Sequence, residues 1–203
     1  MNKLKFILLA FMMLTYAASA QTENKAAKWT IDPVHSRVQF TVTHLVISEV
    51  TGNFQKFEGE IISAKDDFTD VKINFTAEVK SITTENEKRD SHLKSADFFD
   101  AEKYPQIKFV STSFKKISDN KYKLIGNFTM KDVTKPVELA VTYNGTITDP
   151  WGNPRAGFKI TGTMDRFNYN LKWNSLMEAG GAVVGKNIDI LVNVEVVKQK
   201  VGS

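Results

Sequence analysis

Residues 89–100, RDSHLKSADFFD, gather the residue types with which this chain could do chemistry. Three aspartates surround His92 in this segment: Asp90, Asp97 and Asp100. A histidine with carboxylates can bind a metal ion, but zinc needs three or four ligands that the scaffold fixes in place. The other two histidines, His35 and His44, are distant in sequence. The plainer alternative is a solvated charge cluster that holds a short helix, in which Arg89 pairs with a carboxylate or with an anionic ligand head.

His44 is the second candidate, because it continues an alternating apolar series at the end of a predicted strand. The preceding members of the series are Val38, Phe40 and Val42. Parity therefore places the His44 side chain on the inner face. Such a histidine can cap the core through one hydrogen bond, contact the polar head of a ligand, or act as a metal ligand or general base. The sequence leaves these three interpretations open.

Sequence signatures of familiar catalytic sites are missing from the chain. It has no G-x-S-x-G nucleophile elbow and no G-x-G-x-x-G phosphate-binding motif. The Gly-rich stretch 178–185 precedes a predicted strand and so lacks the helix N-terminus that binds phosphate. The absence of cysteine excludes disulfides, thiolate metal sites, cysteine nucleophiles and a lipid-modified N-terminal cysteine. We therefore predict a protein that is not an enzyme and has no metal or cofactor.

Apolar and polar residues alternate with a period of two, which predicts an all-β chain of about eight strands. The runs lie at 37–43, 52–59, 71–80, 107–109, 122–130, 137–147, 158–164 and 188–196. One face of each run is apolar, which suits an antiparallel sheet, and no long helices intervene to build parallel units. Such strands can close into a barrel or stack as a sandwich, and their length favours a barrel. We expect polar turns, including AKDDFTD at 64–70.

Residues 84–96 are the exception to this pattern and predict a short helix. Thr84 followed by Glu87 fits a capping box. One face of the helix would carry a weakly apolar set: Arg89, His92, Leu93 and Ala96. We therefore expect a helix at the rim of the barrel, followed by Phe98 and Phe99, which can turn inward.

The predicted inner face is rich in aromatic residues, and it leaves open whether the lumen is packed or hollow. An eight-stranded barrel is wide enough to be filled by side chains or to hold one small ligand. Inward glycines favour a cavity because each removes a side chain, although they can also relieve strain at barrel corners: Gly126, Gly145 and Gly162. The predicted lining is Phe40, Val42, Phe75, Phe98, Phe99, Phe109, Leu124, Phe128, Tyr143, Phe158, Ile160 and Met164.

Residues 1–20 predict a secretory signal peptide. Lys3 and Lys5 precede an apolar run, and the sequence Ala-Ser-Ala at 18–20 forms a cleavage site before Gln21. The run is shorter than the roughly 20 residues that span a bilayer, and a retained anchor is the alternative. Without these two lysines the 27 basic residues become 25, against 23 acidic residues. Residues 21–203 therefore suit a single domain without the basic cluster that nucleic acid requires.

Several segments together resemble the YceI-like family of exported lipid-binding proteins, over nearly all of residues 21–203. They are WTIDPVHSRVQFTVTH at 29–44, GNFQKFEG at 52–59, SITT at 81–84, RDSHLKSADFFD at 89–100, YPQIKF at 104–109, VTKPV at 133–137 and GGAVVG at 180–185. The segment at 89–100 is the most specific. Asp132 and Asn170 stand where the family tends to have glycine. Both residue types tolerate left-handed backbone, so we expect the turns to be preserved.

The resemblance implies a lipocalin-like, eight-stranded antiparallel barrel in the periplasm, with the short helix in a lid region. It implies a carrier or binder of long-chain amphiphiles, polyisoprenoids above all, with fatty-chain amides or acids as further ligands. It implies no enzymatic activity, and dimers are common in the family. Transient contact with a membrane would accompany loading. Two rival hypotheses are a stress-related interaction module with a packed barrel and a lipid-modifying enzyme that uses His44, His92 and Asp90.

On this interpretation residues 84–100 form a lid whose charges face water while its two phenylalanines close the lumen. A second candidate gate is the loop 172–185, with three apolar side chains: Trp173, Leu176 and Met177. The wet end, where the polar head of a ligand would lie, is expected at His44, Arg89 and His92.

Overall fold

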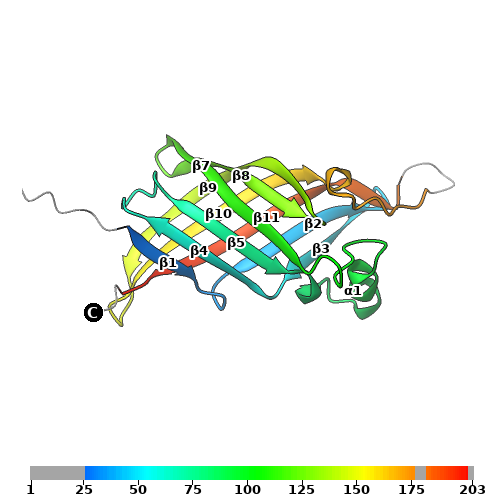
Figure 1. Ribbon diagram of the computed structural model, residues 1–203, viewed down its shortest axis with the longest axis horizontal. Helices are drawn as coiled ribbons and strands as arrows, with labels where there is room; N and C mark the ends of the chain where they lie inside the picture. Colours follow the sequence, from blue (N-terminus) through cyan, green and yellow to red (C-terminus); the bar gives the residue numbers. More distant parts are fainter. Residues whose placement is uncertain (1–25, 177–181, 201–203) are drawn as a thin grey trace, which may run out of the picture.

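The computed structural model describes residues 26–176 and 182–200, which form one antiparallel sheet with a single short helix (Figure 1). The expected signal peptide at 1–20 lies outside this range. None of the described helices is long and apolar enough to cross a bilayer. The strands are β1 Ala27–Ile31, β2 Arg37–His44, β3 Ser48–Phe54, β4 Phe57–Ser63, β5 Lys72–Glu78, β6 Ile82–Thr83, β7 Gln106–Ser118, β8 Lys121–Met130, β9 Val133–Thr148, β10 Pro154–Asp165 and β11 Val184–Lys198.

Strand β11 closes the sheet into a barrel. It pairs with β10 along one edge, and along its other edge with β2 and then β1. β1 in turn pairs with β4, and the ladder continues through β5, β7, β8 and β9 back to β10. Three of the eight walls each consist of two short strands that follow one another along the chain: β1 with β2, β3 with β4, and β5 with β6. The predicted eight-stranded antiparallel barrel with one short helix is therefore confirmed.

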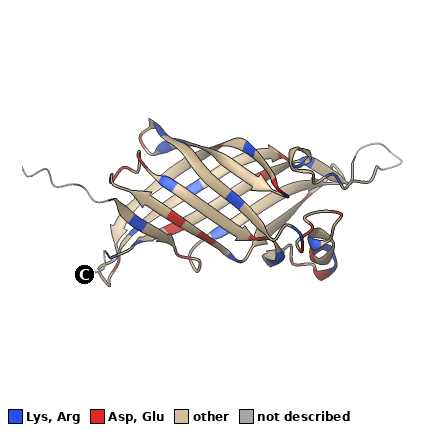
Figure 2. Cartoon of the chain, viewed as in Figure 1, with Lys and Arg blue, Asp and Glu red and all other residues tan. Residues whose placement is uncertain are grey.

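Alternation puts the apolar side chains inside the barrel and the charged ones outside. Two buried clusters fill its two ends, one around Phe54, Phe99 and Tyr169, the other around Trp29 and Phe68. On the outside, basic and acidic residues are interspersed (Figure 2). The two turn positions where the family tends to have glycine, Asp132 and Asn170, both have a φ of 59°, so the expected left-handed turns are present.

Helix α1, Glu87–Lys94, lies outside the barrel wall at one end, as Figure 1 shows. The predicted capping box is wrong, because the side chain of Asn86 caps the helix by accepting from the Arg89 amide at 3.0 Å. Thr84 instead donates its hydroxyl and its amide to the buried carboxylate of Asp90. Burial raises the pKa of Asp90, but the hydrogen bonds from Thr84 and Thr83 outweigh burial and lower it. A buried acid thus fixes the helix to the strand before it.

The opposite end of the barrel is closed by a phenylalanine from the turn at 64–70, which is expected to be polar. Phe68 lies in the turn between β4 and β5 with φ 58°, and it is 2% exposed. Its ring contacts Trp29, Tyr143 and Phe158 at centroid distances of 5.1–5.8 Å. Asp70 holds the turn by accepting hydrogen bonds from the Ser63 hydroxyl and two backbone amides. The expectation for this turn is therefore wrong at one residue, which the left-handed backbone turns inward.

An ionic network lies at the end of the barrel that Phe68 closes. Arg155 donates to Asp149 at 2.8 Å, to Asp32 at 2.8 Å and to Glu195 at 2.5 Å. These residues come from the start of β10, the β9–β10 turn, the β1–β2 turn and β11. The hydrogen bond from Arg155 is the main cause that lowers the pKa of Asp149 to about 2. The hydrogen bonds from His35 and Arg155 lower the pKa of Asp32 as well.

Replacing Arg155 by glutamine should make the barrel less stable and its stability less sensitive to acid. Carboxyl groups with a lowered pKa stabilise the fold at neutral pH, and this contribution disappears as the pH falls from the unfolded value of 3.8 through about 2. Urea denaturation between pH 2 and 7 should therefore show a shallower loss of stability on acidification in Arg155→Gln than in the wild type.

Lys123→Gln is the matched control, because Lys123 pairs with Glu138 on the outer wall, where both side chains are well exposed. It should leave both the stability and its pH dependence close to wild type. An unchanged acid profile in Arg155→Gln would show that the network does not stabilise this end.

Candidate functional site

The barrel encloses an apolar cavity of about 240 Å³. All but three of its lining residues are apolar, the exceptions being Ser36, Gln39 and Arg166. Eleven of the twelve residues predicted from parity and from the lid line it: Phe40, Val42, Phe75, Phe98, Phe99, Phe109, Leu124, Phe128, Phe158, Ile160 and Met164. The volume lies just below the 300–1,000 Å³ of typical small-molecule sites, so the closed lumen suits a slender chain.

Tyr143 is the predicted lining residue that does not reach the cavity. Its ring lies 5.2 Å from that of Phe158 and 5.8 Å from that of Phe68, within the aromatic cluster that closes the barrel. Its hydroxyl is 2.6 Å from Thr146 Oγ1. Tyr143 therefore belongs to the aromatic cluster at the closed end.

Two of the three predicted inward glycines, Gly126 and Gly162, leave no open space, whereas nothing lies within 4 Å of where a Cβ on Gly145 would be. A Cβ at Gly126 would lie 2.4 Å from the Phe109 ring, and one at Gly162 would lie 2.4 Å from Leu139. Each glycine thus accommodates a large neighbour, as glycines opposite aromatic residues do in curved sheets. Gly145, with φ 116°, serves the bulge in β9. None of the three glycines is among the residues that line the cavity.

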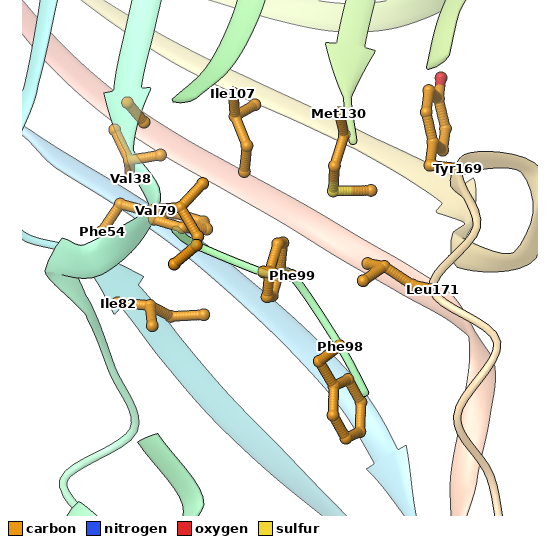
Figure 3. Packing of buried hydrophobic residues seen from close by; sticks show 12 residues of the cluster. Val38, Phe54, Val79, Ile82, Phe98, Phe99, Ile107, Met130, Tyr169 and Leu171 are labelled. Carbon is orange, nitrogen blue, oxygen red and sulfur yellow. The ribbon is translucent and has the colours of Figure 1, made fainter. Parts of the chain in front are cut away.

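The lid segment, residues 84–100, closes the other end with its two phenylalanines. Phe98 and Phe99 are 7% and 8% exposed and line the cavity, and Figure 3 shows both among the buried side chains around them. The chain turns back after α1 because the Phe99 amide donates to Leu93 O at 3.0 Å. The Phe99 ring meets Phe54 edge-on at 6.1 Å. The inward turn of both rings agrees with the expectation from the sequence.

The lid segment contacts the second gate candidate, the gate loop of residues 172–185. The Trp173 ring lies 5.0 Å from the rings of both His92 and Phe98. Lys131, in the β8–β9 turn, donates to Phe98 O at 2.6 Å and to Asn170 O at 3.4 Å, and so connects the lid segment to the residues before the gate loop. Of the other predicted gate residues, Leu176 is 84% exposed and Met177 lies outside the described residues. The two gates therefore meet at Trp173.

The expected polar mouth is not assembled, because its three residues bind locally and do not line the cavity. Arg89 donates to the hydroxyl and the carbonyl of Thr84 at 2.7 and 2.9 Å. The His92 Nε2 atom is 3.1 Å from Asp97 Oδ2. His44 ends β2, where it pairs with Ser48 and Val184. Parity predicts on which face of a strand a side chain lies, but it does not predict whether the end of that strand reaches the cavity.

The acids around His92 do not converge on it as a metal site would require. Asp90 turns its carboxylate to Thr83 and Thr84, and only Asp97 contacts the imidazole. Among the described residues, the His and acid side chains close enough to share an ion lie at the opposite end: Asp32, His35 and Glu195. Arg155 already donates to both of those carboxylates.

Arg166, which begins the short 3-10 helix Arg166–Tyr169, is the functional candidate that the sequence reasoning missed. It lines the cavity near the lid and is 1% exposed. In the sequence, Arg166 is a charged residue that directly follows the alternating apolar residues of β10. Burial lowers the pKa of Arg166, and the charge of Asp165 opposes that effect.

Comparisons with known proteins agree with this architecture. The sequence model of the YceI-like domain family matches residues 29–196. A UPF0312 protein of Pseudomonas putida is 36% identical over 195 residues, which cover 94% of this chain and 97% of the relative. A UPF0312 protein of Staphylococcus aureus is 35% identical over 168 residues, which cover 82% and 95%.

Solved structures show the same fold. The Campylobacter jejuni YceI protein superposes with a TM-score of 0.68 at 29% identity, over 78% of this chain and 90% of that one. A polyisoprenoid binding domain from Saccharophagus degradans superposes with a TM-score of 0.61 at 10% identity, over 84% and 98%. The family model and the relatives cover nearly the whole described barrel, and the chain belongs to the YceI-like family.

Proposed function

We propose that this protein is a periplasmic carrier that holds one long-chain amphiphile, a polyisoprenoid or a fatty-chain lipid, in its lumen. The observation that carries the proposal is the cavity, which is lined almost wholly by apolar side chains and closed by aromatic rings at the lid. Burying a methylene group is worth about 0.8 kcal/mol relative to water. The gain is much smaller for a tail that leaves a membrane, so exchange between sites is the expected mode of action.

The rival functions have less support in the described residues. An enzyme using His44, His92 and Asp90 would need them near the ligand, but none of the three lines the cavity. A packed interaction module would need a filled lumen, whereas Phe40, Phe109 and Phe128 surround open space. The Saccharophagus degradans neighbour is described as a polyisoprenoid binding domain, which favours a prenyl chain as the occupant of the lumen.

An apolar tip beside the lid supports transient contact with a membrane during loading. The tip consists of Val46 and Ile47 in the β2–β3 turn and Leu176 in the gate loop, which are 65%, 87% and 84% exposed. The Leu45 amide donates to Val183 O at 2.9 Å and so joins the two segments. Figure 1 shows both at the barrel end that carries α1. Apolar side chains at that position can enter the lipid interface next to the opening of the lumen.

A tryptophan side chain that fills the lumen should weaken ligand binding, whereas a tryptophan on the outer wall should not. Ile160 lines the cavity, and the neighbouring Lys159 on β10 points outward and is exposed. For protein released by osmotic shock and delipidated, we expect a fluorescent C16 fatty acid to bind at least tenfold more weakly to Ile160→Trp and normally to Lys159→Trp. A wild type that lacks a bound amphiphile in native mass spectra and also refuses the probe would contradict the proposal.

Removing the Trp173 ring should speed ligand exchange. Trp173→Ala deletes two ring contacts between the gate loop and the lid segment, and each such contact is worth about 0.5–1.5 kcal/mol. Stopped-flow displacement of the same probe should show roughly tenfold faster release than in the wild type. Trp151→Ala is the control, since Trp151 is 77% exposed in the β9–β10 turn at the closed end. Equal release rates in both variants would rule out this gate.

Making the tip polar should slow transfer to membranes while stabilising the fold. Val46 has φ 68°, where a β-branched residue is strained and asparagine is tolerated. Val46→Asn with Ile47→Ser should raise the free energy of unfolding by about 1 kcal/mol. Transfer of the probe to phosphatidylethanolamine–phosphatidylglycerol vesicles should slow several-fold.

Ile147→Ser, which changes an exposed apolar residue near the closed end, should not affect the transfer. If the tip instead joins two copies of the chain, the polar variant would sediment as a smaller species than the wild type and transfer lipid at the normal rate.

A further inference from the structure

The guanidinium of Arg166 is buried, and it makes no ion pair with a described residue. All of its acceptors are backbone carbonyls: Nε donates to Gly185 O at 2.8 Å, Nη1 to Leu171 O at 2.5 Å and Trp173 O at 2.8 Å, and Nη2 to Val184 O at 3.1 Å. An arginine has five N–H groups, so one on Nη2 has no partner in the described part of the chain. The side chain of Asp165 instead accepts from the Phe167 amide at 2.9 Å.

The electrostatic setting of Arg166 differs from that of the other structural arginine. Arg155, at the closed end, donates to three carboxylates. Among the described residues, Arg166 donates to backbone carbonyls alone, its guanidinium carbon lies 4.6 Å from the Phe167 ring centroid, and the charge of Asp165 acts on it without an ion pair. A buried charge without an ionic partner is costly, and an arginine keeps its proton under these conditions. An anionic oxygen that reached the remaining Nη2 N–H would therefore gain a strong, charge-assisted hydrogen bond.

The position of Arg166 is that of a head-group site. It lines the same cavity as the lid phenylalanines, and three of its acceptors, Trp173, Val184 and Gly185, belong to the gate loop. Trp173 in turn contacts the lid segment through His92 and Phe98. A chain with its tail in the apolar lumen would place its polar end at this junction of the cavity wall and the gate.

We infer that Arg166 selects amphiphiles that carry an anionic oxygen head, either a carboxylate or a phosphate, over neutral molecules with the same tail. This inference rests on the proposed function, because it needs a tail in the lumen. Head and tail then have separate determinants: the apolar walls bind any slender chain, and the single guanidinium discriminates between heads. Because the site is buried, its preference should persist at high salt, unlike that of a surface patch.

The test compares ligands with matched tails on the delipidated wild type. Dissociation constants are measured for palmitate against palmitamide and for farnesyl phosphate against farnesol, by displacement of a fluorescent probe at neutral pH in 50 and 500 mM salt. We expect the anionic member of at least one pair to bind tenfold or more tightly at both salt concentrations. The pair that responds identifies the head as carboxylate or phosphate. Equal dissociation constants within each pair would overturn the inference, whereas binding of no ligand would overturn the proposed function instead.

The variant Arg166→Gln tests whether Arg166 causes the preference for anionic heads. It should bring the anionic-to-neutral ratio to about one while the neutral ligands keep dissociation constants within a few-fold of wild type. Lys159→Gln is the control, because Lys159 is an exposed cation on the outer face of β10. It should keep the ratio. A ratio that survives in folded Arg166→Gln would refute the assignment, and if this variant does not fold, the wild-type comparison alone decides.

Discussion

Closure of the sheet by β11 is the constraint on which the rest of the structure depends. This strand hydrogen-bonds to β10 along one edge and to β2 and β1 along the other, so the main walls leave no free edge there. Closure also converts a one-sided apolar sheet into an enclosed apolar lumen, because every inward side chain then faces another wall. Without it, the residues around the cavity would form an exposed apolar face. The enclosed apolar cavity is therefore a consequence of strand pairing more than of any single residue.

The two ends of the lumen are closed by similar rings held in different ways. Phe68 is fixed by a tight turn that Asp70 organises through several hydrogen bonds, next to the ionic network of Arg155. Phe98 and Phe99 lie on a segment outside the barrel wall, held by ring contacts with Trp173 and by Lys131. Contacts of the second kind can be broken without unpairing strands. This asymmetry makes the lid end the natural place for a ligand to enter.

The two ends of the barrel also differ in the partners of their arginines. At the closed end Arg155 donates to three acids, whereas at the lid end all the hydrogen bonds that Arg166 makes to described residues go to backbone carbonyl groups. A protein that only needed to hold its gate loop could do so with a neutral donor. The buried positive charge is thus the feature of the lid end that folding alone explains least, and this is the basis for proposing that it distinguishes ligands by their heads.

The sequence by itself determined the strands and the direction of nearly all lumen side chains that they carry, because a period of two is a local property of each strand. For Phe98 and Phe99, which follow the helix and lie outside any strand, it indicated only that they can turn inward. Tertiary structure alone decided what depends on distance between segments. It placed Tyr143 in the closed end, filled the space at Gly126 with Phe109, turned Phe68 inward and satisfied Arg89 at Thr84. It also gave Arg166 its buried position, since no local pattern specifies which carbonyls a folded chain will bring around one side chain.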